Sequence, residues 1–121
     1  LNDVKYSFNS YTMDQLTLVT GAAALSDESY FQETLKKIIA TRERVKGELR
    51  ELGFTIPDSK SNFLFISHPK VAARELFAML REKNIYVRYF DKPRIHNMLR
   101  VTVGTDEEMD RLIACLKEYI C

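Results

Sequence analysis

The segment LRVTVGTDEEMDRL changes its hydrophobic period halfway along, and this change constrains the fold more than any other feature. Over residues 99–103 apolar and polar residues alternate, which is the two-residue period of a strand with one covered face. Thr105 and Glu108 then form a capping box that starts a helix, and apolar residues recur at helical spacing from Met109 onward. A strand and a helix joined by so short a turn must share one core, so the chain is neither all-α nor all-β.

Similar patterns predict the remaining elements. In chain order they are an irregular segment 1–11, a helix 13–25 capped by Thr12, a long helix from Ser26 and Asp27 to Gly53, a short strand 54–56, a turn 57–59, a strand 62–67 with both faces buried, a helix opened by Pro69 and stopped by Asn84, an alternating strand 85–90 and a polar loop 91–97. This order predicts an α/β (α+β) fold in which helices pack on one face of a small, mostly antiparallel sheet.

Length and charge exclude several classes of protein. The 121 residues suffice for one domain with a real core and are too few for two. The 18 basic and 17 acidic residues give a net charge of +1, so no long-range field would gather a nucleic acid. No apolar run approaches the ~20 residues that span a bilayer, and no signal-peptide pattern occurs. We therefore expect neither a nucleic acid nor a membrane as a partner.

The cysteines and histidines do not form a metal-binding pattern. Cys115 and Cys121 lie six residues apart, and His68 and His96 are isolated from them and from each other. This spacing is typical of reduced thiols in a cytoplasmic protein, and we expect no zinc site and no other bound metal.

Two arginines occupy unusual positions in the predicted sheet. Arg100 lies in mid-strand between Leu99 and Val101, and Arg88 lies near the end of the preceding strand. If helices cover the valine face, alternation places both guanidinium groups on the opposite face. Guanidinium donors suit a carboxylate or a phosphate, so the pair is a candidate anion site. The alternative is two surface arginines on a solvated face, and the pattern alone does not exclude it.

Other features have simpler interpretations. Tyr6, Tyr11, Tyr86, Tyr89 and Phe90 suggest base stacking, but packing is the better interpretation without a basic groove. Gly104–Thr105 precedes a helix and favours a plain turn over an anion site. The basic run of the long helix is interpreted as a solvated face; its members are Lys36, Lys37, Arg42, Arg44 and Lys46.

Three segments carry a resemblance to a known family. The run NIYVRYFDKPRIHNMLRVTVGTDEEMDRL is similar to the C-terminal signature of histidinol-phosphate aminotransferases, as are KYSFNSYTMDQLT near the start and ELGFTIPDSKSNFLFI in the middle. The combination VRYF…LRVTVGT is the specific part, since LRVT-x-G alone indicates only the wider fold-type-I aminotransferases. The matches run through the whole chain, so residues 1–121 resemble the single C-terminal small domain of this family.

The resemblance implies an enzyme of histidine biosynthesis that uses pyridoxal 5'-phosphate (PLP) to transfer an amino group between histidinol phosphate and 2-oxoglutarate. It also implies a cytoplasmic homodimer in which this domain closes over a large PLP-binding domain of the same polypeptide, with residues 1–25 as a linker or helix meeting that domain. Arg100 matches the arginine of the family's LR-(I/V)-T-(V/I)-G segment, and Arg88 that of its VR(Y/D)F-type segment. Both are implicated in holding the phosphate of a small phosphorylated amino substrate. Asn9 and Asn62 fall in matched segments without an assigned role.

Part of the family's pattern is missing. No lysine here lies in the serine-lysine-aromatic motif that carries the PLP lysine, and we expect that motif upstream of Leu1, since the chain starts without methionine. The residues that bind the cofactor's ring and phosphate are missing too. Transamination needs a Schiff-base lysine and an electron sink. We therefore expect no catalytic or cofactor-binding residue, no bound cofactor and no activity in this chain alone.

Three other functions stay open. Another fold-type-I aminotransferase, for an aromatic or threonine-phosphate-related substrate, would also use two arginines for a phosphate or a dicarboxylate. A small amino-acid-binding regulatory module would use the open sheet face. A pure interaction domain would use the alanine patch at residues 22–24 and the aromatic residues near the N-terminus.

Overall fold

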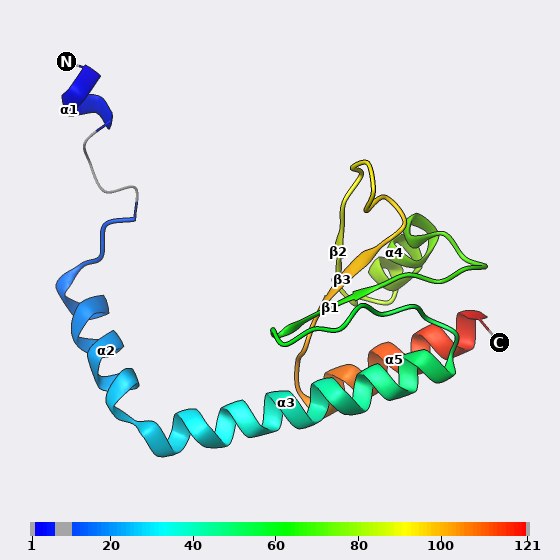
Figure 1. The fold of residues 1–121 in the computed structure, drawn as a ribbon, viewed down its shortest axis with the longest axis horizontal. Helices are drawn as coiled ribbons and strands as arrows, with labels where there is room; N and C mark the ends of the chain where they lie inside the picture. Colours follow the sequence, from blue (N-terminus) through cyan, green and yellow to red (C-terminus); the bar gives the residue numbers. More distant parts are fainter. Residues whose placement is uncertain (1, 7–10, 121) are drawn as a thin grey trace. The chain divides into compact units, whose positions relative to one another are not determined.

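In a computed structural model, residues 2–6 and 11–120 are described, and the chain divides into two compact units, residues 1–34 and residues 35–121. The boundary falls within the longest helix. The elements in chain order are α1 (Asn2–Tyr6), α2 (Gln15–Ser26), α3 (Glu28–Glu51), β1 (Phe63–Ile66), α4 (Ala73–Glu82), β2 (Arg88–Tyr89), β3 (Leu99–Thr102) and α5 (Asp106–Ile120) (Figure 1).

The first unit departs from the sequence prediction at two points. Residues 2–6 form the short helix α1, with Asp3 in its first turn, instead of the predicted irregular segment. An acidic residue there complements the positive end of the helix dipole. The cap of α2 is Asp14 and not Thr12, because the Asp14 carboxylate accepts hydrogen bonds from both the backbone N–H and the hydroxyl of Thr17, at 2.8 Å and 3.1 Å.

The helices of the first unit leave their apolar side chains exposed. The structure buries no residue of α2, and Leu16 and Leu25 are 76% and 86% exposed. Asp27 restarts the helix as predicted, since its carboxylate accepts a hydrogen bond from the backbone N–H of Tyr30 at 3.1 Å. The residues of the first unit whose burial the structure describes therefore contribute helical surface and no buried core.

Helix α3 is terminated by Gly53, as the sequence predicts. This glycine has a φ of +87°, and its N–H donates to the Arg50 carbonyl at 2.9 Å. The next N–H, of Phe54, donates to the Leu49 carbonyl at 3.0 Å. These two bonds form a Schellman motif, which needs a residue with positive φ and so favours glycine.

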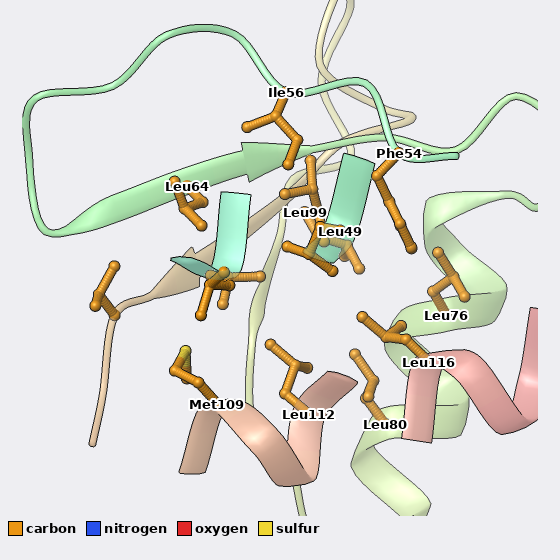
Figure 2. Packing of buried hydrophobic residues seen from close by; sticks show 14 of the residues in the cluster. Leu49, Phe54, Ile56, Leu64, Leu76, Leu80, Leu99, Met109, Leu112 and Leu116 are labelled. Atoms are coloured by element: carbon orange, nitrogen blue, oxygen red, sulfur yellow. The ribbon is translucent and has the colours of Figure 1, made fainter. Parts of the chain in front are cut away.

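The sheet of the second unit has one covered and one uncovered face. Its strands are antiparallel in the order β1-β3-β2. Figure 2 shows strand side chains pointing toward those of the helices, and the shared core consists of Val45, Leu49, Phe54, Ile56, Leu64, Ile66, Ala73, Leu76, Leu80, Leu99, Val101, Val103, Met109, Leu112 and Leu116. Because α3, α4 and α5 all contribute to it, they cover the same face, which confirms the predicted α+β architecture.

Two predicted strands are shorter in the structure. Residues 54–56 make only one bridge, Thr55 to Ser67, because Pro57 has no N–H to continue the pairing. The segment 85–90 pairs only at β2, although Ile85, Val87 and Tyr89 pack against the core as the alternation predicts. The predicted burial of both faces of β1 is also wrong, since Phe63 and Phe65 alternate with the buried Leu64 and Ile66 and remain half-buried.

The start of α4 was predicted too early. The helix begins at Ala73 and not at Pro69, and the Ala73 N–H donates to the side-chain oxygen of Asn97 at 2.8 Å. A distant loop thus supplies the cap, which no local pattern reveals. The end was predicted correctly, since Asn84 has a φ of +58° and the N–H of Ile85 donates back to the helix.

The capping box before α5 is confirmed. The Thr105 N–H donates to Glu108 Oε2 at 2.9 Å, and the Glu108 N–H donates to Thr105 Oγ1 at 3.3 Å. Each side chain therefore satisfies a backbone donor of the other residue, which fixes the turn between β3 and α5.

An ionic cluster joins the C-terminal part of α3 to α5, and the two helices run side by side in Figure 1. Arg44 donates to Asp106 at 2.8 Å and to Asp110 at 2.7 Å, while the Thr41 hydroxyl donates to Asp106 at 2.9 Å. The bonds from Arg44 and then Thr41 lower the pKa of Asp106, so its carboxylate stays ionised near neutral pH.

Candidate functional site

The two arginines singled out from the sequence lie directly opposite each other. Arg88 of β2 and Arg100 of β3 are register partners, and Phe65 of β1 pairs with Arg100 on its other side. Leu99 and Val101 point into the core, so Arg100 points away from it. The structure therefore brings both guanidinium groups together on the uncovered face, on the central strand and its edge neighbour.

Phenylalanine rings surround the two guanidinium groups. The Arg100 guanidinium carbon lies 4.4 Å from the ring centroid of Phe63 and 5.7 Å from that of Phe90, and the Arg88 carbon lies 5.4 Å from that of Phe90. The rings of Phe65 and Phe90 are stacked with centroids 6.1 Å apart. Our sequence analysis missed Phe63 and Phe65 because it assigned a buried position to every residue of this strand. Strict alternation with Leu64 and Ile66 is the signal that could have found them.

Neither arginine has an acidic partner within the ranges 2–6 and 11–120, where no ion pair or hydrogen bond engages its guanidinium group. The Nε atom of Arg100 is buried and has no hydrogen-bond partner. Two like charges face each other across the ladder, which is unfavourable without an anion. The arrangement can accept an anion with several acceptor oxygens from the side of the uncovered face.

Arg42, Arg44 and Lys46 of α3 differ from this pair because acceptors already occupy their donors. Arg42 and Lys46, predicted to lie on a solvated face, are only 5% and 4% exposed. Arg42 donates to Glu43 and to the Ser61 carbonyl, and Lys46 donates to Asp58 at 2.9 Å and Glu43 at 3.0 Å. Asp58 and then Glu43 raise the pKa of Lys46, so it stays charged. The solvated-face prediction holds for Lys36 and Lys37, which are exposed.

The other residues singled out from the sequence, where the structure describes them, do not add donors to the arginine pair. Asn62 is exposed, and its backbone carbonyl accepts the Val103 N–H at 2.8 Å, which extends the pairing of β1 and β3. Asn9 lies outside the described residues, as does Cys121, whereas Cys115 is a half-buried free thiol. At the N-terminus of α5 the carboxylate of Glu108 takes the place of an external anion, so Gly104–Thr105 is a plain turn there.

A lysine side chain is the group through which a protein attaches PLP as a Schiff base. Of the lysines whose side chains the structure describes, only Lys46 is buried, and its two carboxylate partners keep it protonated. A Schiff base requires a neutral amine at the cofactor. Lys46 therefore does not fit the cofactor's attachment site, and every other lysine whose side chain is described is exposed.

The described part of the chain forms neither a metal-binding cluster nor a membrane-spanning helix. No group of three His, Cys, Asp or Glu side chains among the described residues could hold a metal ion. Nor does any helix described by the structure combine the length and the apolar character that crossing a membrane demands.

Known proteins resemble the chain over nearly its whole length. The family model for aminotransferase class I and II matches residues 1–116. A histidinol-phosphate aminotransferase of Brachyspira hyodysenteriae is 50% identical over 120 residues, and one of Lactococcus lactis subsp. lactis is 52% identical over 120 residues. Each alignment covers 99% of this chain but 34% and 33% of the respective relative, so the chain spans about a third of the curated relatives it matches.

A solved structure agrees with these relatives. Histidinol-phosphate aminotransferase from Sinorhizobium meliloti, solved in complex with pyridoxal-5'-phosphate, matches with a TM-score of 0.83 and 26% identity, over 98% of this chain and 33% of that chain. The resemblance inferred from the three sequence segments is thereby confirmed. The chain belongs to the aminotransferase class I and II family.

Proposed function

We propose that this chain is the C-terminal small domain of a PLP-dependent histidinol-phosphate aminotransferase, and that Arg88 and Arg100 bind the phosphate of the substrate. Relatives at 50% and 52% identity support the enzyme class. The observation that carries the residue assignment is the pair of guanidinium groups on the uncovered face, in register and without an acidic partner among the described residues.

The chemistry of the pair favours a phosphate. A phosphate ester carries about −1.5 to −2 charges at pH 7 and three acceptor oxygens, which suits two forks of donors. A carboxylate brings one charge and two oxygens, and so compensates the pair less completely. Arg88 and Arg100 would orient the substrate and hold its charged end, while proton transfer would depend on residues outside this chain.

The rest of the proposal concerns the whole polypeptide. PLP would be held by a large domain, because Lys46, the one buried lysine among the described side chains, is engaged by two carboxylates and the others are exposed. The exposed apolar residues of α2, among them Leu16 and Leu25, would be covered by that domain or by the second subunit of a homodimer. We place residues 1–25 at this junction and the enzyme in the cytoplasm, where reduced cysteines are usual.

The test compares substrates with and without the phosphate group. In the full-length enzyme, Arg100→Ala and Arg88→Ala should each raise KM for histidinol phosphate by about 10- to 100-fold, since a charge-assisted hydrogen bond contributes about 1.5–3 kcal/mol. KM for histidinol, which lacks the phosphate, should change little. Arg50→Ala removes an exposed arginine of α3 and is the matched control. An equal rise for both substrates, or no rise, would contradict the assignment.

The chain alone is proposed to be inactive. The 121-residue chain is incubated with PLP, reduced with borohydride and analysed by peptide mapping. No one lysine should be modified selectively. One lysine modified stoichiometrically would contradict this part of the proposal.

A further inference from the structure

We propose that Phe63 is a positioning residue that fixes the guanidinium group of Arg100, with Phe90 as a second ring shared by Arg100 and Arg88. This inference rests on the anion-binding role proposed above. It starts from the short distance of 4.4 Å between the Arg100 guanidinium carbon and the Phe63 centroid, and from the distances of 5.7 Å and 5.4 Å that join Phe90 to the two arginines.

The aromatic rings offset the repulsion between the two guanidinium groups. Arg88 and Arg100 are register partners, and like charges in such a pair repel each other. A carboxylate would relieve the repulsion, but it would also occupy the donors that the substrate needs. An aromatic face attracts a cation through its quadrupole and accepts none of the in-plane N–H bonds. The rings therefore stabilise both charges while the guanidinium edges stay available to an anion.

The contact with Phe63 also sets the direction from which an anion can bind. Nε of Arg100 is buried without a partner, whereas the two Nη atoms are not among the buried unpartnered atoms of the described chain. Arg100 as a whole is half-buried. The end of the guanidinium group that carries the Nη atoms is therefore the end that meets the substrate.

Holding the guanidinium group in advance lowers the cost of binding. An arginine side chain has about 2 kcal/mol of rotamer entropy to lose, and a stacked group has lost part of it before the substrate arrives. Phe63 lies on β1 opposite Thr102, one diagonal step from Arg100, so its ring reaches across the strand. Phe65, directly opposite Arg100, stacks on Phe90 and supports the second ring.

The inference predicts a selective effect of the aromatic ring. In the full-length enzyme, Phe63→Leu keeps an apolar side chain but removes the ring, and should raise KM for histidinol phosphate about three- to tenfold, the range of one cation–π contact. The value of kcat should stay within about twofold, and KM for histidinol should not change, because only the phosphate contact is loosened. Phe63→Tyr keeps the ring and should restore the wild-type KM.

Phe77→Leu provides the control. Phe77 pairs with Tyr89 on the covered side, with ring centroids 5.8 Å apart, and the cation–π contacts of the two arginines within the described residues involve Phe63 and Phe90 instead. Its loss tests whether any aromatic deletion in the domain alters KM, and we expect no selective effect on the phosphorylated substrate.

The outcomes separate this inference from the proposed function. If Arg100→Ala raises KM for histidinol phosphate while Phe63→Leu does not, Phe63 has no positioning role and the proposed function stands. If Phe63→Leu raises KM for both substrates equally, its role is structural and the inference is overturned. If Arg100→Ala changes neither KM, the proposed function fails and the inference fails with it.

Discussion

The two faces of the three-stranded sheet follow the same alternation but have opposite chemistry. On the covered face, aliphatic residues such as Leu64, Leu99 and Val101 pack against three helices. On the uncovered face, Phe63, Phe65, Arg88 and Arg100 take the alternate positions, and the charged groups have rings but no acidic partners among the described residues. The first face stabilises the domain, and the second carries the arginine pair that we propose binds an anion. Core packing and the proposed binding thus involve adjacent residues of one strand.

The largest expected effect is on the covered face. Leu99→Ala should lower the free energy of unfolding by about 2–5 kcal/mol, because a fully buried leucine leaves a cavity when it is truncated. Urea unfolding followed by circular dichroism measures this change. A loss below about 1 kcal/mol would mean that the core does not depend on β3 as the structure indicates.

A smaller loss of the free energy of unfolding is expected from a substitution at Gly53, which terminates α3. Gly53→Ala should cost about 1–2 kcal/mol, because φ is +87° and the new methyl group would lie 3.1 Å from Nε2 of the buried His68. Gly47→Ala is the matched control, since nothing lies within 4 Å of its added Cβ and alanine favours a helix interior. Equal effects of the two substitutions would show that the Schellman motif is unimportant.

The ionic cluster that joins α3 to α5 is expected to make the free energy of unfolding depend on pH. This effect should be smaller than that of Leu99→Ala or Gly53→Ala. The pKa of Asp106 is lowered from its ordinary value of 3.8, chiefly by Arg44. The ionised Asp106 therefore contributes to the free energy of unfolding above pH 3.8, and this contribution is lost as the pH falls through the lower pKa of the folded state. Asp106→Asn should be less stable than the wild type at pH 7, and the difference should shrink in acid. Urea titrations across this range test it, and a difference independent of pH would exclude the ionic contribution.

The smallest effect on stability is expected on the uncovered face. Arg100→Leu, one residue from Leu99, should change the free energy of unfolding by less than about 1 kcal/mol, because it removes a buried unpartnered Nε and a like-charge pair along with two cation–π contacts. The unfolding measurement used for Leu99→Ala applies here too. A loss as large as that of Leu99→Ala would abolish the distinction between the two faces.

The sequence predicted those parts of the fold that local patterns determine. The capping box at Thr105, the glycine at position 53 and the alternation of β3 were confirmed because each acts over a few neighbouring residues. The cap of Ala73 by Asn97 and the burial of Arg42 and Lys46 were missed, because each depends on a partner on a loop elsewhere in the chain: Asn97, Ser61 and Asp58. Tertiary partners of this kind leave no periodic signal in the sequence.

For the candidate site, alternation predicted that Arg88 and Arg100 share a face, but it did not give their direct register. Register depends on where β2 pairs with β3, which the long loop between them does not fix. The rings were missed for another reason. NFLFIS reads as a continuous apolar run, and burial on both faces was inferred where the second face carries Phe63 and Phe65 beside the arginines.

The most direct test of the central claim is a crystal structure of the full-length enzyme with histidinol phosphate bound. We predict phosphate oxygens within hydrogen-bonding distance of Nη atoms of both Arg88 and Arg100, with the Phe63 ring still stacked on the Arg100 guanidinium group. A phosphate bound elsewhere, with the two arginines facing solvent, would contradict it.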